Sequence, residues 1–245
     1  MFRKEEREGR IRGISVCSTA PWISHLMFAD DCIIFRNATG EEGARVLKIL
    51  GDYEKNSGQK LNKDKTSLFF SKNTESERRE AIKGMLGAQI IQQHKKYLGL
   101  PPLIGKGKRK SFNKIKDQVG RRIAGWKGKL LSSAGQEILF KVVAQATPTY
   151  TMSFFQLPDS LCKELNSMVS GFWWGQRNKE RKMVWVAWEK MCTPKAEGGM
   201  GFKDLKAFNF ALLAKQGWQI LSNPSSLNHK VFKAKYFAKS NFMEA

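Results

Sequence analysis

Residues Leu26–Phe35, with the sequence LMFADDCIIF, place two adjacent carboxylates between two short apolar runs. Apolar runs of this length, bounded by turn signals, are typical of buried strands. We therefore predict a tight strand-turn-strand unit in the protein core, with Asp30 and Asp31 at its tip and Cys32 as a small core residue. A pair of acids held on a rigid ribbon can coordinate Mg2+, which prefers oxygen ligands.

The same pair has a second interpretation. Asp side chains bond nearby backbone amides, so Asp30 and Asp31 are also typical of a surface hairpin turn. Two observations favour the metal-binding interpretation: both flanks are apolar, and the turn lacks the Asn-Gly or Asp-Gly dipeptide that two-residue hairpins prefer. In two-metal nucleotidyl transfer, metal ions about 4 Å apart clamp the attacking and leaving oxygens.

The segment after the hairpin carries helix and strand signals in turn. From residue 41 to 56, an apolar stripe predicts a helix that ends near Gly58. Residues 67–70 predict a short buried strand, and residues 75–86 predict a polar helix. We expect the hairpin, the crossover helix and the returning strand to form one α/β sheet. The helical stripe consists of Val46, Ile49, Leu50 and Tyr53.

A strongly basic segment follows residue 97. Between residues 105 and 129 the only acid is Asp117, and apolar residues recur every three or four positions, which predicts an amphipathic helix with a basic outer face. A charged face is often only solvated, but a face of one sign favours contact with nucleic acid. The apolar positions are Phe112, Ile115, Val119 and Ile123, and the basic ones are Lys106, Lys108, Arg109, Lys110, Lys114, Lys116, Arg121, Arg122, Lys127 and Lys129.

Further helices are predicted downstream. Ser133 with Gln136 three residues later fits a capping box, and the helix that it begins ends before Pro148. Another helix begins near Asp159. We interpret the apolar stripes of both helices as packing faces: Leu139, Val142, Val143 and Ala146 in the first, and Leu161, Leu165, Met168 and Phe172 in the second.

The C-terminal part combines Trp and Gly signals. Alternating apolar residues from 183 to 188 predict a short strand or extended segment that carries Trp185 and Trp188. An exposed Trp can stack on bases, but burial is the commoner outcome and is what we predict. The glycines at positions 198, 199 and 201 predict a turn into a helix that Asp204 caps and that continues to about Leu221.

Composition restricts the class of protein. The 245 residues include 43 Lys and Arg against 22 Asp and Glu, a net charge of +21, which indicates a polyanionic partner such as nucleic acid. The four Cys and three His lack the spacing of a zinc site. No apolar stretch approaches a membrane span, and the charged first residues do not resemble a signal peptide. We expect an intracellular protein, with the nucleus as a candidate compartment and no membrane partner.

Several sequence blocks resemble a known family. The segment ISHLMFADD (residues 23–31) is similar to the FADD-type variant of the YADD box of reverse transcriptases, above all those encoded by plant LINE-type (non-LTR) retrotransposons. The blocks SGQKLNKDKT (57–66), YLGLP (97–101), WKGKLLS (126–132), FWWG (172–175) and GGMGF (198–202) recur in these elements in this order. The resemblance extends over nearly the whole chain, from about Gly9 onward.

The resemblance implies an α+β fold. A partial polymerase palm, made of the β-hairpin, a helix and a strand, would be followed by a mostly helical thumb-like region. We expect residues 1–100 to be the C-terminal part of the palm, residues 101–182 the basic thumb-like domain, and residues 183–245 an extension ending in helices. The implied partners are an RNA template with a DNA primer, or duplex nucleic acid generally, and the implied cofactor is Mg2+.

Individual roles follow from the resemblance by position. Asp30 would be the main metal ligand of the hairpin, and Asp31 a weaker ligand or a support. Lys65 matches a lysine proposed to protonate the departing pyrophosphate, although a surface lysine beside a strand explains it equally well. Tyr97 and Gly99 lie where the family holds the primer end. The thumb-like helix would contact nucleic acid through Lys106, Lys108, Arg109, Lys110, Lys114, Arg121, Arg122 and Lys127.

In this family a third metal-binding Asp comes from an earlier palm strand, whereas Asp30 is the first Asp in this sequence. Phosphoryl transfer depends on positioning and charge stabilisation, so we expect this chain alone to polymerise poorly or not at all. The missing palm and fingers segment would belong to a longer native product or to another chain. Two hypotheses therefore stand: a fragment of an RNA-directed DNA polymerase, and a non-catalytic protein that binds nucleic acid through its basic helix.

Overall fold

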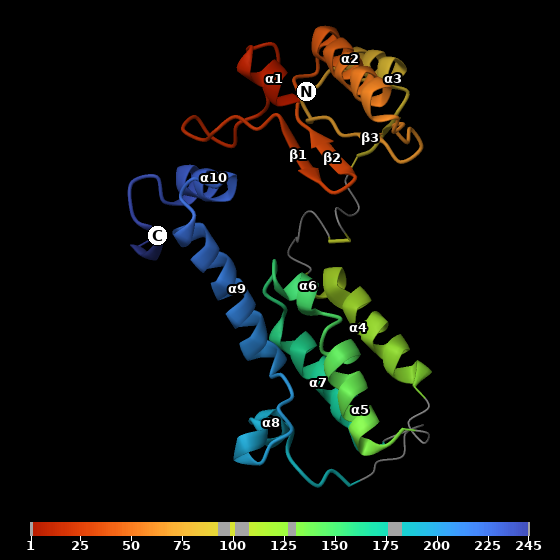
Figure 1. Ribbon diagram of the computed structural model, residues 1–245, viewed down its shortest axis with the longest axis vertical. Helices are drawn as coiled ribbons and strands as arrows, with labels where there is room; N and C mark the ends of the chain where they lie inside the picture. Colours follow the sequence, from red (N-terminus) through yellow and green to blue (C-terminus); the bar gives the residue numbers. More distant parts are fainter. Residues whose placement is uncertain (1, 93–98, 101–107, 127–130, 176–182, 245) are drawn as a thin grey trace. The chain divides into compact units, whose positions relative to one another are not determined.

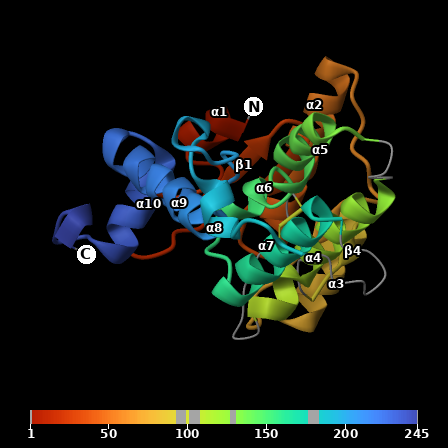
Figure 2. The same cartoon turned by 90° about the horizontal axis from the view of Figure 1, so that it is seen from below.

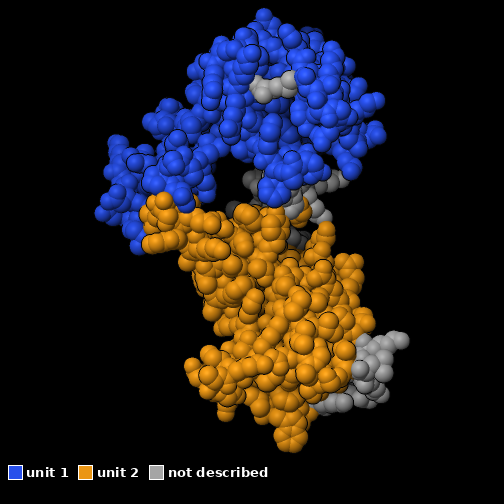
Figure 3. All heavy atoms as spheres, viewed as in Figure 1, with its two compact units in different colours: residues 1–97, 223–245 blue, residues 98–222 orange. Residues whose placement is uncertain are grey.

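The computed structural model describes residues 2–92, 99–100, 108–126, 131–175 and 183–244. Its fold is mixed α+β, as predicted: helices dominate, and the strands of the described residues form two sheets of two strands each. The chain forms two compact units, which Figure 3 colours separately: unit 1 is residues 1–97 with 223–245, and unit 2 is residues 98–222. The domain limits predicted from the sequence stay predictions.

Unit 1 combines a β-hairpin, a small parallel βαβ element and helices (Figure 1). Its elements are α1 (Phe2–Arg7), β1 (His25–Phe28), β2 (Asp31–Ile34), α2 (Gly40–Ser57), β3 (Ser67–Leu68), α3 (Ser76–Leu86), β4 (Gln89–Ile90), α10 (Leu227–Tyr236) and the 3-10 turn η4 (Phe242–Glu244). Its core consists of Phe2, Ile11 and Ile49, with Ile34 and Leu50 partly buried against them. The core therefore joins α1, α2 and the end of β2.

The predicted hairpin is present, but the prediction that it lies in the core is wrong. β1 and β2 are antiparallel, and Phe28 pairs with Asp31 across the turn. Met27 and Phe28 are each 60% exposed, and Cys32 is exposed rather than a core residue. The reason is that the hairpin is a sheet of only two strands. Its base packs on the core through Ile34, while its tip has no covering layer within the described residues.

The predicted returning strand is shorter than expected and has a different partner. β3 contains only Ser67 and Leu68, both half-buried, and Phe69 beyond them is exposed. β3 pairs in parallel with β4, so the single α/β sheet with the hairpin does not form in the described residues. Parallel strands need a crossover connection, and α3 supplies it between β3 and β4.

Helix α2 follows its sequence signals closely. Its N-cap is Thr39, whose side chain accepts a hydrogen bond from the backbone of the first turn, and its C-cap is Gly58 with a φ of 71°. A left-handed residue at this position is usually Gly, because other residues are strained there. Val46 and Ile49 are buried as predicted, whereas Tyr53 is exposed. The predicted helix over residues 75–86 is confirmed as α3.

Unit 2 is helical in the part that the structure describes. Its elements are α4 (Lys108–Gly125), α5 (Ser133–Leu139), the π-helical segment η2 (Phe140–Ala144), α6 (Thr149–Met152), α7 (Asp159–Trp173), α8 (Trp188–Cys192), the 3-10 turn η3 (Lys195–Glu197) and α9 (Leu205–Ser222). Helices α4 and α7 lie side by side (Figure 2). Between α4, α7 and α9 lies one core, which includes Phe112, Val119, Leu161, Leu165 and Leu205. Helix α7 was predicted correctly, but its predicted stripe only in part: Leu161 and Leu165 are buried, whereas Met168 and Phe172 are half-buried.

A second core of unit 2 is mostly aromatic. Phe140 and Phe202 are buried at its centre, and their ring centroids are 5.1 Å apart. Trp188 stacks on Phe202 at 5.4 Å with nearly parallel planes. Phe172, Trp173 and Trp126 complete the cluster. The prediction that the aromatic residues of this region form packing contacts is confirmed for these side chains.

The predicted start of α5 is wrong by one residue. The N-cap is Ser132, whose hydroxyl accepts a hydrogen bond from the Gly135 amide at 3.2 Å. Ser133 is therefore inside the helix, and Gln136 is one position too far along to complete the capping box.

The predicted apolar stripe of this helix is also wrong. Val142 is 66% exposed and Ala146 is exposed, whereas Phe140 and Ala144 are buried. The π-helical segment η2 explains the difference, because hydrogen bonds from residue i to i+5 add a residue to the turn. A stripe drawn at 3.6 residues per turn then falls on the wrong face.

Trp185 and Trp188 have different surroundings. Residues 183–187 form no strand, and Trp185 is 76% exposed, so the prediction of a buried Trp185 is wrong. Trp188 begins α8 and is partly buried in the aromatic core, as predicted. The turn at 198–201 is also confirmed: Gly198 and Gly201 have φ values of 81° and 64°.

Helix α9 begins and ends as the sequence predicts. Asp204 accepts hydrogen bonds from the amides of Lys206 (2.8 Å) and Ala207 (3.3 Å), and the helix ends at Ser222. Its buried Asn209 was not predicted. The Asn209 side chain accepts from the Leu157 amide and donates to two backbone carbonyls, so it ties α9 to the segment between α6 and α7.

Candidate nucleic-acid interface and carboxylate hairpin

The hairpin holds both predicted carboxylates at its tip. Asp30 lies in the turn and Asp31 is the first residue of β2, and both are exposed. Within the described residues, neither carboxylate has a hydrogen-bond or ion-pair partner, and no group of three or more His, Cys, Asp or Glu is arranged to hold a metal ion. Two hard oxygen ligands fit Mg2+ chemically. Their role as metal ligands stays a prediction.

The tip of the hairpin has an unusual backbone. Ala29 has a φ of 50°, and it is the one non-glycine residue with positive φ in the described part of the chain. A two-residue turn requires such a conformation, and Ala adopts it at a cost of about 1–2 kcal/mol. Residues opposite each other in an antiparallel pair share a face, so Asp31 lies on the face of Phe28. Asp30 lies in the turn itself, so the turn positions its carboxylate, whereas strand β2 positions that of Asp31.

The base of the hairpin is anchored by polar and aromatic contacts. Ser24 is 2% exposed, its carbonyl accepts from the Phe35 amide at 2.9 Å, and its hydroxyl is 2.7 Å from Nδ1 of His25. The His25 ring stacks on Phe2 at 5.3 Å. Burial is the main cause of a lowered pKa for His25, and burial also lowers the pKa of Arg36, which donates to the Phe35 carbonyl. The hairpin is therefore rigid at its base and exposed at its tip.

The structure does not bring Lys65 to the carboxylates through any hydrogen bond or ion pair in the described residues. Lys65 is exposed in the turn before β3, and its amide donates to the Asn62 side chain at 3.1 Å. Gly99 is exposed with a φ of 79°. Tyr97, Lys106 and Lys127 lie outside the described residues. The predicted roles of these residues stay predictions.

Helix α4 lies within the predicted basic segment, and the side chains of residues 108–111 lie outside what the structure describes. Its eighteen residues include the single acid Asp117 and the basic residues Lys108, Arg109, Lys110, Lys114, Lys116, Arg121 and Arg122. Phe112, Ile115 and Val119 are buried on its inner side, as predicted. Lys114 and Arg121 are exposed and lie on the opposite side of the helix. Each residue advances an α-helix by about 1.5 Å, so the two residues are about 10 Å apart along the helix axis.

Arg122 and Lys116 of α4 bond residues from elsewhere in unit 2. Arg122 donates to the Thr147 hydroxyl at 2.8 Å, and Lys116 forms an ion pair with Glu164 on α7 at 2.7 Å. Sequence reasoning missed both partners, since neither lies near α4 in the sequence. The Lys116 pair neutralises one charge on the side of the helix that faces α7. Lys114 and Arg121 are exposed on the side of α4 away from the core, and Nε of Arg121 donates to the Asp117 carbonyl at 3.3 Å.

Comparison with known proteins gives two relatives in Arabidopsis thaliana. The chain is 36% identical over 137 residues to "Putative ribonuclease H protein At1g65750", an alignment that covers 56% of this chain and 22% of that protein. It is 46% identical over 100 residues to "Uncharacterized mitochondrial protein AtMg00310", which covers 40% of this chain and 65% of that protein. The chain thus spans about a fifth of the first relative and just under two thirds of the second. No family model matches the sequence.

Among the helices that the structure describes, none is both long enough and apolar enough to cross a bilayer.

Proposed function

We propose that the chain is a fragment of a reverse transcriptase from a plant LINE-type retrotransposon, and that it binds nucleic acid through the outer face of α4. The observation that carries the binding proposal is the position of Lys114 and Arg121. Both are exposed, and the opposite side of the same helix is locked into an apolar core. A rigid helix that presents charges of one sign suits contact with successive phosphates.

The comparisons support a retroelement origin without specifying an activity. One relative carries the name "Putative ribonuclease H protein At1g65750". The motif blocks around Asp30 and Asp31 and downstream of them supply the specific resemblance to reverse transcriptases. A net charge of +21 provides a general attraction for polyanions of any sequence.

The binding surface can be tested with a matched pair of double variants. Lys114→Gln/Arg121→Gln removes two exposed charges from α4. Lys48→Gln/Lys55→Gln removes two exposed charges at the same spacing from α2, which also has eighteen residues. Both variants lower the net charge equally. The proposal predicts that only the α4 variant loses much affinity for a fluorescent RNA–DNA template-primer.

The hairpin supports a more limited proposal about polymerisation. Two carboxylates can contribute to a Mg2+ site, and two-metal transfer needs further ligands to bridge and position both ions. We propose that a carboxylate from a further polypeptide segment completes the site. This chain by itself should then bind a template-primer without extending it.

Primer extension on an RNA template tests that proposal. The reaction is run with Mg2+ and then Mn2+, beside an Asp30→Asn/Asp31→Asn variant. We expect no extension by either protein, with equal template binding. Extension by the unmodified chain that the variant lacks would mean that the hairpin assembles a working metal site without the added segment.

The second candidate function is a non-catalytic nucleic-acid-binding protein. The exposed hairpin tip, where neither carboxylate has a partner among the described residues, favours it over catalysis by this chain alone. The two candidates share the α4 surface and differ only at Asp30 and Asp31. The extension assay therefore separates them, while the α4 variants test what they share.

A further inference from the structure

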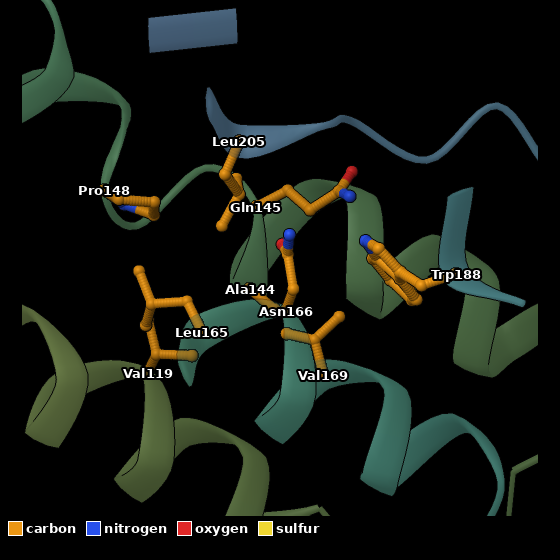
Figure 4. Close-up of a pocket in the computed structure, with 9 residues that line it drawn as sticks. All are labelled: Val119, Ala144, Gln145, Pro148, Leu165, Asn166, Val169, Trp188 and Leu205. Atoms are coloured by element: carbon orange, nitrogen blue, oxygen red, sulfur yellow. The ribbon is translucent and has the colours of Figure 1, made fainter. Parts of the chain in front are cut away.

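A small cavity lies inside unit 2 where α4, η2, α7 and α9 meet, next to the start of α8 (Figure 4). The volume of the cavity is about 10 Å³. Most of its wall is apolar, with Val119, Leu165 and Leu205 among the lining side chains. Its polar wall consists of Gln145, Asn166 and Trp188.

The three polar side chains come from separate elements and point toward the same space in Figure 4. Gln145 follows η2, Asn166 lies on α7, and Trp188 begins α8. Oε1 of Gln145, Oδ1 of Asn166 and Nε1 of Trp188 are all buried, and none has a hydrogen-bond partner among the described residues. The cavity therefore brings two acceptors and one donor together.

The orientation of Gln145 is held from two sides. The side chain is 2% exposed, and its Nε2 donates to the Lys203 carbonyl at 3.5 Å. Its backbone amide donates to the Phe140 carbonyl at 3.0 Å, the i to i+5 bond of the π-helical segment. The π-helical turn contains one more residue than a regular α-helical turn, and this shift in period places Gln145 in the interior.

We propose that this cavity is a binding site for one structural water molecule that joins α7, α8 and the end of η2. The water accepts a hydrogen bond from the Trp188 indole N–H. It donates its two protons to the side-chain carbonyl oxygens of Gln145 and Asn166. Every buried polar atom of the trio is then satisfied, as is the rule for buried polar groups.

The size and chemistry of the site select this ligand. A single water molecule needs a cavity of about 10–15 Å³ and two to four polar partners. This cavity offers about 10 Å³ and three polar side chains. A larger ligand does not fit. An anion would face two carbonyl oxygens, and a metal cation would face an N–H donor, so both are disfavoured. A neutral molecule that donates two hydrogen bonds and accepts one matches the three polar side chains of the cavity wall.

The site can be tested by NMR on the full-length 15N-labelled chain. A long-lived bound water gives a direct nuclear Overhauser cross-peak between the water resonance and the Trp188 indole proton, and its intensity should not change with pH. The Trp188→Phe variant assigns the indole signal. The exposed Trp185 is the internal control, since its indole proton exchanges with bulk solvent and its cross-peak should grow with pH.

Two results would overturn the proposal. One is the absence of a water cross-peak at the Trp188 indole in the unmodified chain, as expected if the indole bonds Asn166 directly. The other is a cross-peak that persists unchanged in Asn166→Leu, a variant of similar volume that removes one acceptor. We expect the cross-peak to be lost in that variant. The measurement on the unmodified chain is decisive even if the variant does not fold.

Discussion

Replacing Asn209 with Leu should be among the most damaging single substitutions in unit 2. The Asn209 side chain accepts from the Leu157 amide at 2.8 Å and donates to the carbonyls of Met152 at 2.8 Å and Phe155 at 3.0 Å. Asn209 itself is 3% exposed, so water cannot replace the lost bonds without entering the core. Leu has a similar volume and cannot make any of the three bonds.

The magnitude follows from the number of polar groups that lose their partner. Each buried unsatisfied group costs about 1–3 kcal/mol, and partial relaxation makes the three costs less than additive, so we expect a loss of about 3–5 kcal/mol. With a urea m value of about 2 kcal/mol/M, the unfolding midpoint should fall by about 2 M with little change in m. Tryptophan fluorescence is a suitable probe, because six of the seven Trp lie in unit 2 and only Trp22 lies outside it.

The matched control is Asn113→Leu. Asn113 is exposed on α4, and the same change there should alter the free energy of unfolding by no more than about 0.5 kcal/mol. A loss below about 1 kcal/mol for Asn209→Leu would refute the reasoning, because a single unsatisfied buried group should already cost that much.

Three further predictions concern single positions. A Cβ on Gly199 would lie 2.1 Å from the Thr193 carbonyl oxygen, so Gly199→Ala should strongly lower the thermal midpoint; Gly84→Ala, on α3 with open space around it, should instead raise stability by about 0.5–1 kcal/mol. Hydrogen bonds from Lys141 and Lys195 lower the pKa of Glu137 below its ordinary 4.5, so the stability that they supply is fully present above pH 4.5 and is lost as pH falls through the lowered pKa. Acid unfolding of Glu137→Gln should lack this part of the pH dependence. Burial raises the pKa of both the Cys32 and the Cys192 thiols, that of Cys192 to about 11, and Cys32 is the more exposed side chain; mass spectrometry after limited alkylation at mildly alkaline pH should therefore find Cys32 modified before Cys192.

The sequence predicted local structure wherever a local signal determines it. The stripe of Val46 and Ile49 with the stop at Gly58 predicted α2, and Asp204 predicted the start of α9. The inner face of α4 was predicted because its helix keeps the regular period. In the helix that contains η2, the same reasoning failed, because the i to i+5 bonds of η2 shift the period.

Burial and pairing depend on tertiary structure, and these were the main errors. LMFADDCIIF predicts two strands and a turn, but no local feature shows that Met27 and Phe28 are exposed. The parallel partner of β3 was missed because β4 contains only two residues, too few for a pattern. On α4, the sequence could not show that Glu164 pairs with Lys116, since the two helices meet only in the folded chain.

The most direct test of the account is the salt dependence of template-primer binding. Each phosphate contact contributes about 0.9 to the slope of log K against log salt for duplex DNA. If Lys114 and Arg121 each contact a phosphate, Lys114→Gln/Arg121→Gln should flatten the slope by about 2 and weaken binding about 60-fold at 100 mM salt. Lys48→Gln/Lys55→Gln should leave the slope unchanged. Equal slopes for the two variants would contradict the α4 interface and leave only the general attraction of a basic protein for polyanions.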